Sequence, residues 1–248
     1  MPADFMDIPV AYLVYATLVV FIAYTIKGLS GFGSGLIAVP LLAFILPLKV
    51  VVPVLGLLSY GGTIIQSITL RKKAQWKLIF SLIPFSLAGV VLALWLLVNL
   101  DQNLLSLFLG MFVIVYSLYT FKPVQSINTT KYGTVIAGCL GGFIGALFGT
   151  GGPFYVIYLK LRQLDKGQFR ATIASIFLLD GAMRISAYGA SGLYTQQVIT
   201  LTLIFIPVLL IALYAGNHVH VKINEHQFNR MISLILFFSG IMLVIKSL

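Results

Sequence analysis

Long apolar segments recur along the whole chain and are separated by short polar stretches. Most are close to the roughly 20 residues that an α-helix needs to cross a bilayer. Two apolar segments are shorter and directly follow clusters of glycine, which is typical of broken or re-entrant helices. The pattern predicts an all-α polytopic membrane protein with about eight full spans, at 10–27, 50–70, 78–98, 103–121, 132–148, 171–190, 197–215 and 229–246, and two short helices, at 33–47 and 152–161.

The two short helices begin at similar interruptions, "GLSGFGSGLIAVPLL" at 28–42 and "GALFGTGGPFYVIYLKLR" at 145–162. Shifting the chain by 117 positions, the distance from Gly35 to Gly152, places one interruption on the other. Five segments then fall in each half, and an odd number gives the halves opposite orientations. We therefore expect two inverted-topology repeats, 1–121 and 132–248, joined by a cytoplasmic linker at 122–131.

Composition and charge agree with a membrane protein. The chain is 60% hydrophobic and 9% charged, whereas soluble domains have about 25% charged residues. Its net charge of +10 is explained by basic loops on the cytoplasmic side, so no nucleic-acid partner is expected. Only if both short helices carry the chain across do the basic clusters at 71–77 and 160–170 both lie inside. The positive-inside rule therefore favours crossing over turning back.

The interruptions are candidates for an anion site. A backbone break at membrane depth is tolerated only where it is buried in protein or lines a wet cavity. Each break precedes a helix N-terminus, whose free N–H groups and partial positive charge attract anions. Close helix packing is the competing explanation for the glycines, and Gly56, Gly61, Gly62, Gly110, Gly138, Gly141 and Gly142 are assigned that role alone. The predicted substrate-binding residues are Gly31, Gly33, Ser34, Gly35, Thr150, Gly151, Gly152, Pro153 and Arg184.

Two charged residues lie well inside a predicted span, in "FLLDGAMRISAY" at 177–188. Asp180 and Arg184 are four residues apart, so they share one helix face and can form an ion pair. Charges at membrane depth are costly and indicate function by default. Arg184 is expected to supply positive charge to the anion, with Asp180 as its charge partner or as a proton relay. A purely structural pair is the alternative.

The segments 28–42 and 145–181 resemble the two signature segments of the sulfite exporter TauE/SafE family, and the resemblance covers nearly the whole chain. It implies a secondary transporter of small sulfur-containing anions such as sulfite, sulfoacetate or thiosulfate. It also implies a multi-pass protein of the bacterial inner membrane, whose partners are the small anion and the lipid bilayer. The chain could act alone or as a homo-oligomer.

Two other classes of function compete with transport. An intramembrane aspartyl hydrolase needs two facing carboxylates, whereas Asp180 is the one acidic residue well inside a span. The single cysteine, Cys139, makes a thiolate metal cluster implausible, and no cofactor is expected. An enzyme is therefore not predicted. A non-transporting scaffold or accessory subunit is the alternative, and it would tolerate changes in the glycine clusters with folding defects only.

Overall fold

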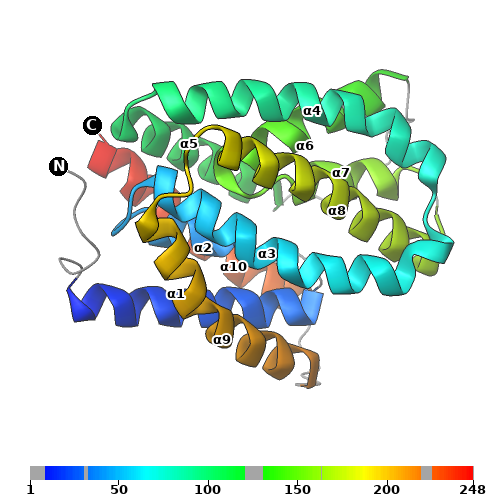
Figure 1. The fold of residues 1–248 in the computed structure, drawn as a ribbon. Helices are drawn as coiled ribbons and strands as arrows, with labels where there is room; N and C mark the ends of the chain where they lie inside the picture. Colours follow the sequence, from blue (N-terminus) through cyan, green and yellow to red (C-terminus); the bar gives the residue numbers. More distant parts are fainter. Residues whose placement is uncertain (1–8, 31–32, 121–130, 163, 219–224, 248) are drawn as a thin grey trace. The chain divides into compact units, whose positions relative to one another are not determined.

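The computed structural model describes residues 9–30, 33–120, 131–162, 164–218 and 225–247, and these residues form helices joined by short turns (Figure 1). No strand occurs within these ranges, which confirms the all-α prediction. Predicted residue Gly31, and the predicted linker apart from Lys131, lie outside them. The helices are α1 (Val10–Ser30), α2 (Ser34–Leu42), α3 (Leu48–Leu70), α4 (Trp76–Asn99), α5 (Gln102–Thr120), α6 (Lys131–Phe148), α7 (Gly152–Lys160), α8 (Lys166–Ala190), α9 (Gln196–His218) and α10 (Glu225–Ser247), with a 3-10 turn η2 (Arg71–Lys73) before α4.

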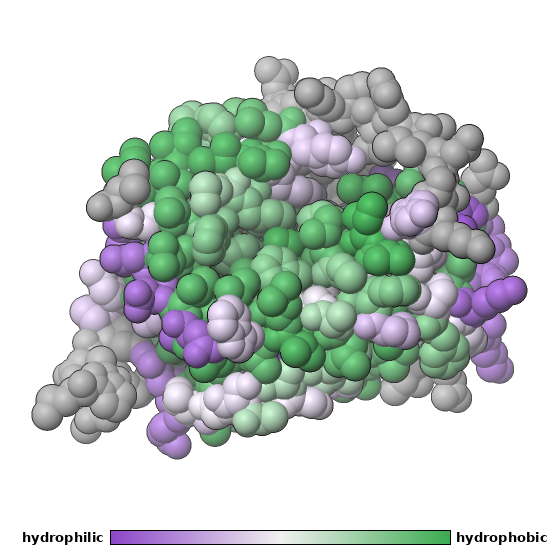
Figure 2. Space-filling view, turned by 90° about the horizontal axis from the view of Figure 1, so that it is seen from above, coloured by the Kyte–Doolittle hydropathy of each residue, from purple (hydrophilic) through white to green (hydrophobic). Residues whose placement is uncertain are grey.

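Apolar length identifies the membrane-crossing helices. In α1, α4, α5 and α9 the structure holds segments long and apolar enough to cross a bilayer, and α3, α6 and α10 hold shorter apolar segments. The long helix α8 is less apolar because it carries Asp180 and Arg184. Hydrophobic side chains cover most of the face seen in Figure 2, as expected for a surface in contact with lipid. The chain is a polytopic membrane protein.

The helices form two compact units, and each unit contains helices from both halves of the sequence. The first unit holds residues up to 55, 100–124 and 194–248. Inside it, α1 packs on α9 and α5 packs on α10. The second unit holds residues 56–99 and 125–193. Inside it, α4 packs along α6 and contacts α8, while α7 contacts both α6 and α8.

Glycines allow close approach of the helix backbones within each unit. In the first unit, a Cβ on Gly110 would come 2.9 Å from the backbone oxygen of Gly240. In the second, a Cβ on Gly142 would collide with the backbone oxygen of Ser86, and one on Gly138 would come 2.8 Å from that of Leu82. The packing role predicted for these three glycines is therefore confirmed. For Gly61 the prediction is wrong, because no residue that the structure describes lies within 4 Å of the place of its Cβ.

The short helix α7 is held in the core of the second unit. Tyr155, Tyr158 and Leu159 are buried there against Ile79 and Leu82 of α4, among other apolar side chains. Just beyond the C-terminus of α7, the Arg162 guanidinium stacks on the Tyr158 ring and donates to the Thr134 hydroxyl of α6. Packing of one face of α7 on its neighbours fixes where its N-terminus lies.

Candidate functional site

The interruption between α6 and α7 begins at the C-terminus of α6. The N–H of Gly149 donates to the Gly145 carbonyl at 2.9 Å, and Gly149 adopts a φ of 68°, a conformation that favours glycine. Thr150 follows, and Gly151 is the N-cap of α7. Three residues thus separate two helices, and the chain changes direction within the second unit.

The N-terminus of α7 carries no capping side chain. Gly151 makes no side-chain cap hydrogen bond, and no acidic residue occupies the first turn. Pro153 lies in that turn, where its missing N–H removes a group that a helix start leaves unpaired in any case. The partial positive charge of the helix end is therefore not offset by a residue of its own first turn.

Thr150 lies directly before this helix end. The residue is 4% exposed, and its hydroxyl has no hydrogen-bond partner among the residues that the structure describes. A buried hydroxyl without a partner costs about 1–3 kcal/mol on mutational scales, so such groups are rare unless a ligand or water satisfies them. Its position directly before an uncapped helix end makes Thr150, with this free hydroxyl, a candidate for binding a polar ligand at the break.

The predicted ion pair in α8 is present. Arg184 Nε lies 3.0 Å from Asp180 Oδ2, as expected for residues four apart on one helix face. Arg184 Nη1 also donates to the Gly145 carbonyl at 2.7 Å, which brings the guanidinium to the end of α6. The side chain of Arg184 is 16% exposed and that of Asp180 only 1%, so Arg184 is the member that a small ion can reach.

Asp180 belongs to a larger polar network that the sequence analysis did not find. Its Oδ1 accepts hydrogen bonds from the Ser86 hydroxyl at 2.7 Å and from the Tyr155 hydroxyl at 2.8 Å. These two hydroxyls also lie 2.9 Å from each other. Together with Arg184 and Gly145, the network connects α4, α6, α7 and α8 at the break. Ser86 and Tyr155 lie in apolar runs, so the pattern around them contains no sign of this role.

Gly145 lies between Asp180 and the start of α7. A Cβ built on Gly145 would lie 3.4 Å from Gly151 Cα and 3.6 Å from both Gly151 N and Asp180 Oδ2. A Cβ on Gly151 would collide with the backbone oxygen of Gly141. Packing on α6 is therefore enough to explain the glycine at 151, whatever else this position does.

The predicted residues around the first interruption lie in the other unit. Gly33 is the N-cap of α2 with a φ of 94°, and α2, like α7, has nine residues. Ser34 is 4% exposed and begins the helix, followed by Gly35. The first unit thus also contains a short helix that starts at a glycine without a side-chain cap.

Comparisons with known proteins identify the family of the chain. A family model described as sulfite exporter TauE/SafE matches residues 16–243. The chain is 23% identical over 175 residues to a probable inner membrane transporter protein, TsaS of Comamonas testosteroni, and the match covers 69% of this chain and 73% of that relative. No solved structure matches the chain.

These matches, with the apolar helices, place the chain among multi-pass inner membrane proteins, as the sequence predicts. The transporter class is supported equally by the family and by the relative. The chain belongs to the sulfite exporter TauE/SafE family.

Proposed function

We propose that this transporter moves small sulfur-containing oxyanions, such as sulfite, thiosulfate or sulfoacetate, and binds them at the N-terminus of α7. The observation that carries the proposal is the buried, unpartnered hydroxyl of Thr150 beside an uncapped helix end. The guanidinium of Arg184 reaches the same break through Gly145. A hydroxyl, backbone amides and a guanidinium are the donors that an oxyanion requires.

The length of α7 supports a site near the membrane midplane. Its last residue is Lys160, an exposed cation suited to the membrane surface. Nine residues at 1.5 Å each give a length of about 13 Å, and the hydrocarbon core is about 30 Å thick. The N-terminus of α7 then lies roughly halfway through the core. The predicted span in α8 begins at Ala171. At 1.5 Å per residue, Asp180 lies about 13 Å along the helix from that residue, which also places it near the midplane.

Contacts within each unit support the inverted topology. In the first unit, Lys246 Nζ donates to the Phe44 carbonyl at 2.7 Å. In the second, residues 72–75 line one pocket together with Asp165 and Gln168. Each set must lie on one side of the membrane, because the core is about 30 Å thick. Since α4 and α5 are each long enough to cross, this shared side supports our proposal that α6 and α7 together return the chain to the side where α6 begins.

The repeats therefore remain part of our proposal: 1–121 and 132–248, each with a short broken helix. In a Cys139→Ser background, we expect cysteines introduced at Ala74 and Leu164 to react with an impermeant maleimide from the cytoplasmic side. A cysteine at Tyr194 should react only from outside. Labelling of positions 74 and 164 from opposite sides would show that α7 does not return the chain, and the inverted repeat would have to be abandoned.

We further propose that the N-terminus of α2 in the first unit, with Gly33, Ser34 and Gly35, also offers donors to an anion. Gly31 belongs to the same proposed set. The shared length of α2 and α7 and their corresponding positions in the sequence support this extension.

The Thr150→Val variant tests the site, because the affinity for the anion should fall while the stability of the protein does not. Valine has nearly the same shape as threonine but no hydroxyl. Removal of a buried, unpartnered hydroxyl should leave the free energy of unfolding unchanged or raise it by about 1 kcal/mol. If that hydroxyl binds the anion, the affinity for sulfite should fall about tenfold, or roughly 1.4 kcal/mol. Thermal unfolding in detergent and flux into proteoliposomes measure the two effects.

Ser175 of α8 provides a matched control. Its hydroxyl is also fully buried and has no partner among the described residues. It lies nine residues before Arg184, about 13 Å along the helix. Ser175→Ala should therefore preserve both folding and sulfite affinity, and Thr150→Ser should preserve transport. Unchanged affinity in a well-folded Thr150→Val protein would exclude the hydroxyl from the site.

A further inference from the structure

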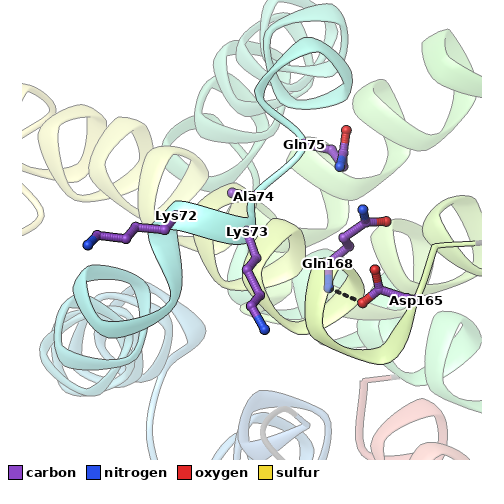
Figure 3. A pocket seen from close by; sticks show the side chains of 6 residues that line it. All are labelled: Lys72, Lys73, Ala74, Gln75, Asp165 and Gln168. Atoms are coloured by element: carbon purple, nitrogen blue, oxygen red, sulfur yellow. Dashed lines mark hydrogen bonds between the residues drawn. The ribbon is translucent and has the colours of Figure 1, made fainter.

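A pocket of about 350 Å³ lies in the second unit, away from the α6–α7 break, and transport as proposed above does not use it. Figure 3 shows the six residues that line it, at η2, the start of α4 and the first turn of α8. Apart from Ala74, all of them are polar or charged: Lys72, Lys73, Gln75, Asp165 and Gln168.

The pocket has an excess of positive charge. Two lysines and one carboxylate line the pocket, and that carboxylate is already engaged, because Asp165 Oδ1 accepts from the backbone N–H groups of Gly167 at 2.8 Å and Gln168 at 2.9 Å. Asp165 thereby caps α8. Two glutamine side chains add neutral hydrogen-bond donors. The lining therefore suits an anionic group with several acceptor oxygens.

Lys73 is the lysine whose side chain lies over the first turn of α8 at the pocket. A Cβ on Gly167 would lie 3.4 Å from Lys73 Cδ and 3.7 Å from Lys73 Nζ, so the lysine chain extends over the glycine in the first turn of α8. In Figure 3, Lys73 extends toward the turn that carries Asp165 and Gln168, whereas Lys72 projects away from them. The backbone nearby is fixed, because Gln75 N donates to the Thr172 hydroxyl at 3.0 Å.

Aromatic side chains beside the pocket mark the membrane surface. Trp76 directly follows the pocket residue Gln75 and is 41% exposed, and its ring contacts that of Phe80, which is 64% exposed, at a centroid distance of 5.8 Å. Exposed tryptophan is typical of the headgroup level of a bilayer, and the basic residues identify the cytoplasmic side. The pocket therefore lies where phosphate groups of lipids are concentrated.

From these four features we infer that the pocket binds the phosphate of an anionic phospholipid of the cytoplasmic leaflet. Lys73, Gln75 and Gln168 hold the phosphate, and Lys72 adds charge at the rim. The acyl chains extend along the outward apolar side at Trp76 and Phe80. Basic pockets at the cytoplasmic ends of membrane helices bind lipid headgroups in this manner.

The test compares two double variants that remove equal charge. Lys72→Gln with Lys73→Gln changes the pocket, and Lys77→Gln with Lys160→Gln changes two exposed lysines that do not line it. Binding of phosphatidylglycerol to the delipidated protein is measured by native mass spectrometry, with phosphatidylcholine and inorganic phosphate as separate arms. A hydrogen bond to a charged group contributes about 1.5–3 kcal/mol, so loss of the Lys73 contact should make the pocket variant bind phosphatidylglycerol at least about tenfold more weakly.

The control variant should retain most of its affinity, and all three proteins should unfold at the same temperature without lipid, because the four lysines are exposed. Equal losses in both double variants would show general electrostatic attraction and overturn the inference. Equal binding of phosphatidylcholine, or inorganic phosphate bound as tightly as the lipid, would overturn it as well. Transport of sulfite is not part of the readout, so this result is independent of the proposed function.

Discussion

Replacement of Asp180 by asparagine is expected to lower the free energy of unfolding by about 3 kcal/mol. Asparagine keeps an oxygen that can accept from Ser86 and Tyr155, but it replaces the charged Oδ2 that faces Arg184 with an uncharged NH2 group. It leaves the guanidinium of Arg184 without its carboxylate, and loss of one member of a buried pair costs about 3–5 kcal/mol. The lower end applies because Arg184 is 16% exposed. Chemical unfolding in detergent measures the change.

The double variant Asp180→Asn with Arg184→Gln separates structure from transport. Removing both charges leaves no unpaired charge, so most of the lost stability should return. Transport should nevertheless be lost, since glutamine lacks the charged, planar fork that binds oxyanions. Normal flux in the double variant would show that the pair is structural, and the anion site would then consist of backbone and hydroxyl donors alone. Wild-type stability of Asp180→Asn would contradict the buried ion pair itself.

Replacement of Gly151 by alanine should prevent the second unit from folding normally. Its Cβ would collide with the backbone oxygen of Gly141, which cannot move without shifting α6. Overpacking of a core costs about 1–3 kcal/mol, and a collision with backbone belongs at the upper end or beyond. We expect little folded protein in the membrane and a strong loss of thermal stability, as measured by fluorescence-detected size exclusion. Transport would be lost with the fold.

Gly61→Ala is the matched control, because nothing lies within 4 Å of its Cβ and the residue is inside helix α3. Alanine there should be neutral or should stabilise the helix by about 0.5–1 kcal/mol. Equal, wild-type behaviour of both variants would contradict the close contact of α6 with the start of α7. The collision also means that a bulky residue at 151 tests folding, whereas Thr150→Val tests the site.

Much of the fold was predictable because its signals are local. Apolar length gave the helices, and the glycines with Pro153 marked where α7 begins. The spacing of Asp180 and Arg184 predicted their ion pair, since residues four apart share a helix face. Each of these predictions depends on neighbours along one stretch of chain, where the geometry of a helix is known in advance.

The rest depended on which helices meet. Ser86, Tyr155 and the Gly145 carbonyl belong to α4, α7 and α6, and only the packing of these helices brings them to the pair in α8. For the same reason Gly61 was assigned wrongly to close packing: its sequence context resembles that of Gly142, but no backbone lies opposite it. The pocket lined by Lys72 and Lys73 also depends on two segments that are far apart in sequence, 72–75 and 165–168.

The packing of early helices against late ones has a consequence for biosynthesis. Gly28 of α1 fits against Gly216 of α9, with only 3.0 Å between the place of its Cβ and Gly216 Cα. At a translation rate of about 5–20 residues per second, α1 waits roughly 10–40 s for this partner. Its glycine-bearing surface is meanwhile open to lipid or to other inserted chains. An insertase or chaperone that shields α1 during this interval would therefore protect the surface that later packs on α9.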